Sequence, residues 1–218
     1  MGLSVGDRDI TDIRYGDRLI EQVFAGPVEV WRRLHRWEQA GVSKTLTVPA
    51  WARYVDLVAL GGGGGGTSGS GIAGGKGNGG VAGAFATRCW PVTPGQDITV
   101  TIGEPGQGGR DSADLAVGTA GGPTVITTPG NTFSAAGGGA GTGGGGGVGT
   151  SPGSVDYTPT RGTVRDTTTQ SGGGAAGDNT DGQWPGGGGG PGTGGILGNR
   201  QRGRPGASGI CWYRFGAY

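Results

Sequence analysis

The sequence of 218 residues has little charge, little apolar content and almost no histidine, cysteine or methionine. Charged residues make up 15% of the chain, which argues against a disordered chain kept in solution by self-repulsion. Hydrophobic residues make up 32%, which is too few for one large conventional core. The formal net charge of +1 gives no electrostatic reason to expect nucleic-acid binding.

The chain also lacks long apolar runs. No stretch approaches the ~20 apolar residues of a membrane-spanning helix, and the beginning of the chain carries charges and no apolar run. We therefore expect neither a signal peptide nor insertion into a membrane. The single histidine, His35, has no second histidine and no cysteine cluster with which to hold a metal, so no zinc site is expected.

The two cysteines lie far apart, and each is followed directly by tryptophan, as Cys89-Trp90 and Cys211-Trp212. A secreted disulfide scaffold would have a denser set of cysteines. We interpret both as small buried side chains on neighbouring strands, with a disulfide between them as the alternative.

What the chain does have is glycine, at 58 positions. Glycine runs occupy residues 61–66, 137–139, 143–147, 172–174 and 186–190, and glycine recurs at every third position within 71–83, 138–147, 186–198 and 203–209. This period matches the left-handed polyproline-II-type helix, which has three residues per turn and no internal hydrogen bonds. Because glycine has no Cβ, such helices can approach and bond laterally. We therefore predict ordered, polyglycine-II-like insertions.

In such a lattice the free energy gained from hydrogen bonds only about offsets the entropic cost of ordering the chain, so the lattice needs anchors at its ends. Ordering one residue costs roughly 1–2 kcal/mol, and each net backbone hydrogen bond contributes about 0.5–1.5 kcal/mol. Pro185 and Pro191 flank the run 186–190 and restrict φ in advance, and Trp184 precedes it. A flexible glycine linker is the alternative. The bracketing residues and the persistent phase favour the lattice.

Short strands alternate with the glycine-rich insertions. We expect strands at residues 46–48, 54–60, 84–89, 98–102, 124–126, 133–136 and 210–215. The Thr-Pro-Gly-Gln sequence of residues 93–96 is typical of a turn. Several short strands without helical periodicity predict that residues 39–218 form an all-β domain, a β-sandwich. We expect the first and last of these strands to pair or face each other.

Residues 1–38 differ from the rest, because they lack glycine runs and repeat with a period of ten. Ile10, Ile20 and Val30 are equivalent positions, and each unit predicts a strand, a glycine-centred turn and a second strand. Two such units form a small β meander that is too small to bury a core alone. We interpret residues 1–38 as an attachment or oligomerisation segment. Residues 31–40 fit a short helix and a linker equally well.

No catalytic motif stands out. Matches to Gly-x-Gly-x-x-Gly are unavoidable in so much glycine, and none follows a strand and opens a helix with a suitably placed acid. The only Gly-Lys pair, Gly75-Lys76, is followed by Gly77, and no spacing singles out a pair of carboxylates. Residues 178–181 lack the full acidic pattern of a calcium loop. We expect a non-enzymatic protein without catalytic residues, cofactor or metal.

The candidate ligand contacts are aromatic side chains in loops. They are Trp184, with Gln183 and Asp181 beside it, and Tyr157. Sugar recognition favours an aromatic face with hydrogen-bonding neighbours. For Trp184 we favour the alternative that its ring caps the glycine lattice. The alternating arginines Arg200, Arg202 and Arg204 are interpreted as part of a solvated loop, with contact to phosphate or an acidic glycan as the alternative.

The order of these features is similar to a known family. The residues that carry the similarity are 47–49, 55–66, 93–103, 121–125 and 135–141, with 13–17 and 28–31 before them. An apolar strand running straight into a glycine block, then a Pro-Gly turn leading into a strand that ends in glycine, resembles the glycine-rich domain of tailed-bacteriophage minor tail proteins. The two short N-terminal stretches resemble the repeats that begin many such proteins.

The resemblance implies a virion structural protein of the tail tip, made in the host cytoplasm, that contributes to tail assembly and host-surface contact. Its partners would be other tail-tip proteins and copies of itself in a homotrimer. Some phage adhesins display loops at the ends of a polyglycine helix sandwich. A receptor-binding adhesin that recognises host cell-envelope glycan is therefore the alternative, and a head-decoration protein is a weaker one.

Overall fold

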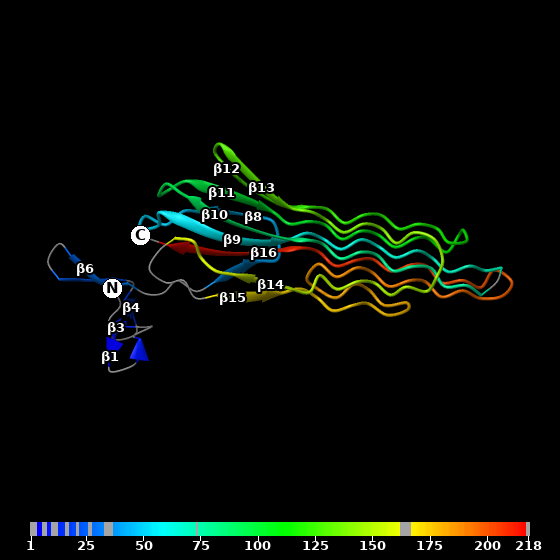
Figure 1. Cartoon of the computed structure of the whole chain (residues 1–218). Helices are drawn as coiled ribbons and strands as arrows, with labels where there is room; N and C mark the ends of the chain where they lie inside the picture. Colours follow the sequence, from blue (N-terminus) through cyan, green and yellow to red (C-terminus); the bar gives the residue numbers. More distant parts are fainter. Residues whose placement is uncertain are drawn as a thin grey trace. The chain divides into compact units, whose positions relative to one another are not determined.

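Every regular element in the described part of the chain is a β-strand, which confirms the predicted all-β class. The structure, a computed structural model, describes residues 37–72, 74–161 and 167–216, together with the strands of the first 36 residues. The chain divides into two units, residues 1–37 and residues 38–218 (Figure 1).

The first unit consists of antiparallel hairpins. The paired strands are β1 (Ser4–Val5) with β2 (Arg8–Asp9), β3 (Ile13–Tyr15) with β4 (Arg18–Ile20), and β5 (Gln22–Ala25) with β6 (Val28–Arg32). The strand–turn–strand units expected from the ten-residue repeat therefore exist. Among the described residues, each pair forms a two-stranded sheet of its own and the hairpins are not joined into one larger sheet.

The second unit contains two four-stranded antiparallel sheets. The first has the order β10–β9–β16–β7 and consists of β7 (Glu38–Ala40), β9 (Tyr54–Leu60), β10 (Phe85–Pro91) and β16 (Ile210–Gly216). The second has the order β13–β12–β11–β8 and consists of β8 (Lys44–Thr47), β11 (Asp97–Thr101), β12 (Thr124–Thr128) and β13 (Asn131–Ala135). These sheets form the predicted β-sandwich. They include all the strands expected from the apolar pattern.

The hydrophobic core lies between the two sheets. Val55, Leu57 and Ala59 of β9 are fully buried and meet Ile98 and Val100 of β11 in one cluster. These residues alternate along their strands, so one face of each sheet points inward. The strands β8 and β16, the first and last that the sequence predicts, do not pair: they lie in opposite sheets, and Lys44 of β8 donates to the Tyr213 hydroxyl of β16 at 3.0 Å.

Three strands were not expected from the sequence. β14 (Ser154–Tyr157) and β15 (Thr168–Ser171) form an antiparallel pair with few apolar residues, so no alternating apolar pattern marks them. β7 lies within residues 31–40, for which the sequence allowed either a short helix or a linker. It pairs with residues 211–213 of β16. A three-residue strand is too short to give a periodic signal.

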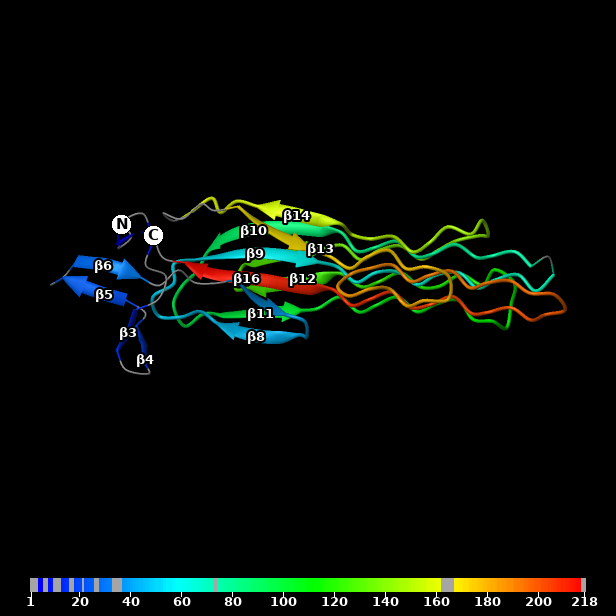
Figure 2. The same ribbon diagram turned by 90° about the horizontal axis from the view of Figure 1, so that it is seen from below.

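The glycine-rich segments run side by side away from the sheets, as both ribbon views show (Figure 1 and Figure 2). Residues 61–69, which follow β9 directly, are here called the central segment. Every residue of the central segment is buried. The glycine-rich part therefore has an interior of its own, built with almost no side chains.

Backbone hydrogen bonds from the central segment repeat every three residues. The N–H groups of residues 61, 64 and 67 donate to carbonyls of segment 78–84, those of residues 62, 65 and 68 to segment 116–122, and those of residues 63, 66 and 69 to segment 201–207, with N···O distances of 2.8–3.2 Å. Acceptor numbers fall as donor numbers rise, so these three neighbours run antiparallel to the central segment. A three-residue repeat is that of the polyproline-II-type helix.

Three more segments donate hydrogen bonds to the central segment. Their donors are the N–H groups of Gly106 and Gly109, of Gly138 and Gly141, and of Gly189 and Gly192. Donor and acceptor numbers rise together, so these neighbours run parallel. The central segment thus has six neighbours. All of its N–H groups, and every carbonyl from residue 62 to residue 67, are bonded to them. The predicted ordered lattice is confirmed, and the flexible-linker alternative is wrong.

The central segment has glycine wherever a neighbouring segment lies against it, and has side chains only where a neighbour has ended. A Cβ built on any of its glycines would lie 2.0–2.3 Å from a carbonyl oxygen of a neighbour. Side chains occur only at Thr67 and Ser68. On these two sides the neighbouring segments have already turned away, one of them at Gly143 with φ +71° and the other within residues 110–115. The remaining neighbour continues, and position 69 is glycine again.

Candidate functional site

The lattice carries loops at the end opposite the sheets (Figure 2). The loops at residues 70–76, 110–115, 142–147 and 195–200 each join an outgoing glycine-rich segment to a returning one. A fifth loop, at residues 177–181, ends earlier along the lattice. Gly195 donates its N–H to the Ser70 carbonyl at 3.1 Å, and Gly198 donates to the Gly71 carbonyl at 3.2 Å. These bonds hold the first and last loops side by side.

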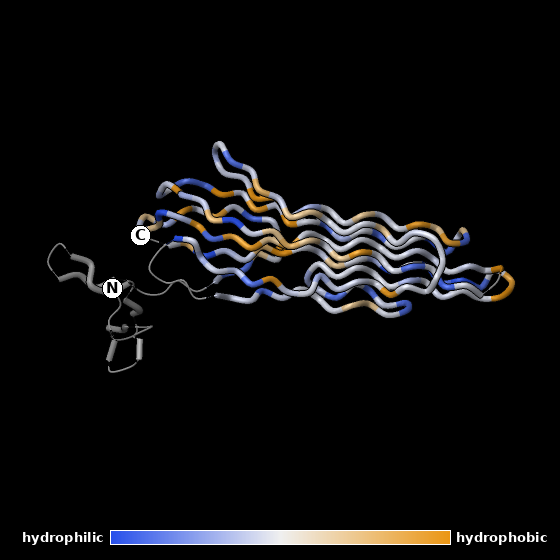
Figure 3. Tube along the Cα trace, in the orientation of Figure 1, coloured by the Kyte–Doolittle hydropathy of each residue, from blue (hydrophilic) through white to orange (hydrophobic). Residues whose placement is uncertain are grey.

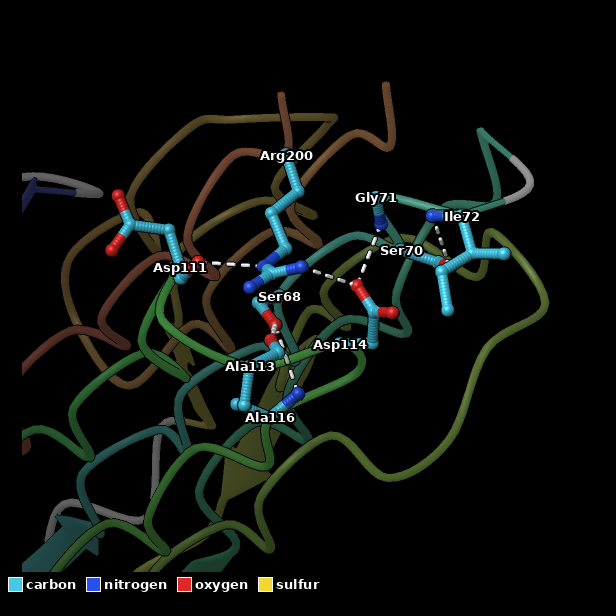
Figure 4. A network of polar contacts seen from close by, with 9 residues as sticks. All are labelled: Ser68, Ser70, Gly71, Ile72, Asp111, Ala113, Asp114, Ala116 and Arg200. Atoms are coloured by element: carbon cyan, nitrogen blue, oxygen red, sulfur yellow. Dashed lines mark hydrogen bonds and ion pairs between the residues drawn. The ribbon is translucent and has the colours of Figure 1, made fainter. Parts of the chain in front are cut away.

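Arg200 ties three of these loops together (Figure 4). Its Nε donates to the carbonyl oxygen of Asp111 at 2.6 Å, and its Nη1 donates to Oδ1 of Asp114 at 2.6 Å. The same carboxylate oxygen accepts the Gly71 N–H at 2.7 Å. The Gly71 N–H and then the charge of Arg200 hold the pKa of Asp114 below its usual value. The interpretation of this region as a solvated loop is therefore wrong for Arg200.

Two further side chains brace the same end of the lattice. The Ser68 hydroxyl donates to the Ala113 carbonyl at 3.0 Å and accepts the Ala116 N–H at 2.8 Å, which closes the 110–115 loop (Figure 4). Asn78 Nδ2 donates to the carbonyl of residue 142 at 2.7 Å, and its Oδ1 accepts the N–H of residue 147 at 3.1 Å. The loops are thus fixed by side chains that the lattice itself presents.

Apolar side chains are exposed at this end. The exposed fractions of Ile72, Ile196 and Leu197 are 83%, 77% and 97%. Leu197 has φ +56°, a backbone conformation that residues other than glycine rarely adopt. Figure 3 shows hydrophobic colour at the far end of the lattice, beyond a pale stretch of glycine. We call these three residues the apolar tip.

A pocket of about 410 Å³ opens beside the apolar tip. Its lining consists of Ser70, Gly75, Lys76, Leu115 and residues 144–146. Leu115 also has a positive φ, of 50°. Lys76 forms an ion pair with Asp178, so its ammonium already has a partner. The pocket offers mainly backbone and one leucine side chain to a ligand.

Three of the predicted contact residues, Asp181, Gln183 and Trp184, are close in sequence and lie away from this end. Trp184 is 52% exposed, and its ring lies beside Gly41, the residue that follows β7. Gln183 is exposed, and its carbonyl accepts the Gly187 N–H at 3.0 Å. Asp181 is exposed and lies 4.0 Å from Arg204. The three residues are exposed, but their side chains have different neighbours: the Trp184 ring lies beside Gly41, the Gln183 amide beside Gly174, and the Asp181 carboxylate nearest to Arg204.

Tyr157 does not lie in a loop, and this prediction is wrong. It is the last residue of β14, and only 7% of its side chain is exposed. Its hydroxyl donates to Oδ1 of Asp56 at 2.7 Å. Burial, followed by the hydrogen bond and charge of Asp56, raises the pKa of Tyr157 above its usual value.

Asp56 is the centre of a buried polar cluster that the sequence did not reveal. It is fully buried, and Arg214 Nη2 donates to its second oxygen at 2.7 Å. Arg214 stands opposite Asp56 in the ladder between β16 and β9. One signal was present in the sequence, because Asp56 is the single charge in the apolar strand 54–60. The cluster attaches β14 to the outer face of the first sheet.

The cysteines are not bonded to each other. Both are free thiols, with β9 between their strands. Cys211 belongs to the core cluster on the inner face, whereas Cys89 stands opposite Asp56, whose side chain lies on the outer face. Burial raises the pKa of Cys211 to about 12, and burial followed by the charge of Asp56 raises the pKa of Cys89 to about 11. The disulfide alternative is therefore wrong. The expected placement on neighbouring strands is wrong too, and only Cys211 is fully buried, whereas Cys89 is half-buried.

The described ranges contain neither a metal-binding group nor a membrane-spanning helix. No three residues among His, Cys, Asp and Glu gather there to hold a metal ion. Within the same ranges, no helix is long and apolar enough to cross a membrane. What the described geometry offers chemically is contact, through loops that are fixed in place by a bonded lattice.

Comparison with known proteins shows the family of this chain. A family described as a glycine-rich domain matches residues 38–216. The match covers the sandwich and the whole lattice. Among curated proteins, none matches the chain.

Proposed function

We propose that this chain, which belongs to the glycine-rich domain family, is a non-enzymatic virion protein, a minor tail protein at the tip of a bacteriophage tail. It is made in the host cytoplasm and incorporated into the particle, where it contributes to tail assembly and host-surface contact. Its partners are other tail-tip proteins and copies of itself in a homotrimer.

The observation that carries this proposal is the six-neighbour lattice around the central segment. A backbone bonded on all sides makes a rigid rod, and the rod holds its loops at one end in fixed positions. A tail tip requires such a part, because its end must meet a surface without collapsing. The direct run of β9 into Gly61 is also one of the features that resemble the phage family.

The first unit supports the assembly part of the proposal. Its two-stranded sheets are individually too small to be stable in water. Such hairpins need another surface to pack on, and a neighbouring subunit in a particle supplies one. In the proposed role residues 1–37 attach the chain to the tail, and residues 38–216 form the projecting part.

Two measurements test the proposal. Antibodies raised against the purified chain, labelled with gold, should bind phage particles at the tail tip in electron micrographs. A variant lacking residues 1–37 should fold but fail to enter particles. The deletion must stop before Glu38, because a start at residue 42 would remove β7 and expose the edge of β16. Labelling on the head, or none on any particle, would contradict the proposal.

The exposed ring of Trp184 favours a second candidate function. With Gln183 and Asp181 beside it, this ring has the composition of a sugar contact, as in an adhesin that binds cell-envelope glycan. A chain with Trp184→Ala should then lose binding to purified host polysaccharide, and Val117→Ala, a control at a 54% exposed position on a returning lattice segment, should keep it. Equal binding by both variants would remove this candidate.

A further inference from the structure

We propose that the apolar tip, formed by Ile72, Ile196 and Leu197, is a contact site that inserts into the apolar layer of a lipid bilayer. The inference names lipid as the chemical class of partner in the proposed host-surface contact. It rests on the proposed function only in that a tail tip meets a cell envelope. The sequence alone gave no reason to expect it, because a shallow contact needs no long apolar run.

The conformation of Leu197 is the first argument. A residue with φ +56° is cheapest as glycine, and this chain uses glycine at 58 positions. Leucine at this φ strains the backbone, and its side chain is 97% exposed, so it contributes no burial in return. Neither backbone geometry nor packing explains this leucine. Contact with something outside the chain does.

The position of the three side chains is the second argument. The hydrogen bonds from Gly195 to Ser70 and from Gly198 to Gly71 place their two loops next to each other. In both ribbon views the loop at residues 195–200 projects furthest from the sheets (Figure 1 and Figure 2). The strongest exposed apolar residues of this end are therefore the first part of the lattice to meet a surface.

The charges at this end favour an uncharged contact. The charged side chains of the projecting loops, with Asp178, comprise three cations and three anions: Lys76, Arg110 and Arg200 with Asp111, Asp114 and Asp178. Four of these side chains form two ion pairs, Lys76 with Asp178 and Arg200 with Asp114. A site for phosphate or an acidic glycan would leave cations free. Arg110 and Arg202 are exposed beside these pairs, so the salt dependence measured below separates their contribution from that of the apolar side chains.

The residue types favour lipid over a protein or a sugar. The loops at residues 70–76, 110–115, 142–147 and 195–200 contain no aromatic residue. Protein hot spots are rich in tryptophan, tyrosine and arginine, and sugar sites use aromatic faces. Separate aliphatic side chains on projecting loops instead suit a medium that deforms around them.

The expected binding is weak for one chain. Three aliphatic side chains bury about as much hydrocarbon as one acyl anchor, which alone gives an association constant of about 10⁴ M⁻¹. Several copies at one tail tip would strengthen it through multivalency. A single chain should therefore bind reversibly and detectably at high lipid concentration.

Vesicle flotation with the purified full-length chain tests the inference. The probes are vesicles of phosphatidylcholine, and vesicles of phosphatidylethanolamine with phosphatidylglycerol. The wild type should float with both, and the bound fraction should change less than about two-fold between low and high salt. Leu197→Gly should bind about ten-fold more weakly. The triple variant Ile72→Ser, Ile196→Ser, Leu197→Gly should stay in the unbound fraction.

Val42→Ser is the matched control, because Val42 is 73% exposed and lies near the sheets. It should float like the wild type. Leu197→Gly relieves a strained φ, so it should fold at least as well as the wild type, and thermal melting checks this. No flotation of the wild type, or equal flotation of Leu197→Gly, would overturn the inference.

Two other results would also overturn it. Binding only to the anionic vesicles, abolished by salt, would mean that the cations carry the contact. Binding only to vesicles that contain host envelope proteins would mean a protein partner. Particle labelling separates these failures from that of the proposed function. A chain that labels the tail tip without binding lipid disproves the inference alone, and one that floats without entering particles disproves the function alone.

Discussion

A Cβ built on Gly64 would lie 2.0 Å from the carbonyl oxygen of Gly139, whereas a Cβ built on Gly139 would meet nothing nearer than Cγ2 of Val81, at 3.9 Å. The contact between these two glycines is therefore one-sided. Gly64 is surrounded by backbone, and Gly139 has room for a methyl group. The requirement for glycine is absolute in the centre of the lattice and relaxed at some outer positions.

Gly64→Ala should destabilise the chain by about 3 kcal/mol or more, because the new methyl group overlaps backbone that cannot rotate away. Gly139→Ala is the matched control. It should leave the free energy of unfolding unchanged or raise it by about 0.4–1 kcal/mol through the less flexible unfolded chain. Urea unfolding followed by circular dichroism measures both. Equal effects of the two substitutions would contradict the packing described here.

Amide hydrogen exchange should be slowest in the central segment. All N–H groups of residues 61–69 are buried and bonded, so they should exchange only when the lattice opens as a whole. The amides of the loop at residues 195–200 should exchange faster. Mass-spectrometric exchange of the purified chain measures the difference. Exchange of the central segment at the rate of a free peptide would disprove the lattice.

Tyr157→Phe should lower the free energy of unfolding by about 1.5–3 kcal/mol, because a buried carboxylate loses one of its donors. Thr169→Val is the control in the same pair of strands. Its hydroxyl donates to the exposed Asp156 at 2.6 Å, and its loss should cost less than about 1 kcal/mol. Chemical denaturation measures both variants. A loss for Thr169→Val as large as that for Tyr157→Phe would argue against the Asp56 cluster as the attachment of β14.

The stability of the chain should fall in alkaline solution. The pKa of Cys89 is raised to about 11 and that of Cys211 to about 12, from an ordinary value of 9.0. The unfolded chain loses these protons first, so the contribution is complete below about pH 9 and is lost as the pH rises through the folded values. Urea unfolding at about pH 8 and about pH 10 tests this. In the double variant Cys89→Ala, Cys211→Ala the fall should be smaller; an unchanged fall would mean that other groups cause it.

Asp114→Asn should loosen the loops without unfolding the chain. The substitution keeps the shape of the side chain and removes its charge from Arg200, so exchange should quicken in residues 70–76 and 110–115 while the midpoint of urea unfolding stays that of the wild type. The pKa of Asp114 is lowered, so its contribution is present above the ordinary value and is lost on acidification. Acid should therefore loosen the same loops in the wild type. Unchanged exchange in both experiments would contradict the bracing role.

The sequence could predict the lattice because its signal is periodic. Gly203, Gly206 and Gly209 recur every third residue, and each lies against a carbonyl of Gly66, Gly63 or Leu60. The core strands were predictable for the same reason, since β9 and β11 alternate apolar residues on their inner faces. A regular spacing of one residue type along the chain indicates that those positions share the same environment, even when the residues that surround them are unknown.

The rest of the site depends on contacts between distant parts of the chain. Arg200 binds Asp114 across 86 positions, and Tyr157 binds Asp56 across 101. No local pattern encodes either pair, so a bracing arginine resembled a solvated one and a buried tyrosine resembled a loop residue. β14 remained hidden because its pairing, and not its apolar content, makes it a strand.

The three-residue hydrogen-bond repeat restricts how this chain can change length. One or two residues added within a glycine-rich segment would rotate every later Cα onto the wrong neighbour, whereas a whole triplet would restore the phase one turn further on. The same insertion in a connecting loop would disturb no register. Gene variants of this domain should therefore differ freely in their turns, but grow or shrink along the rod only in multiples of three codons, matched between adjoining segments.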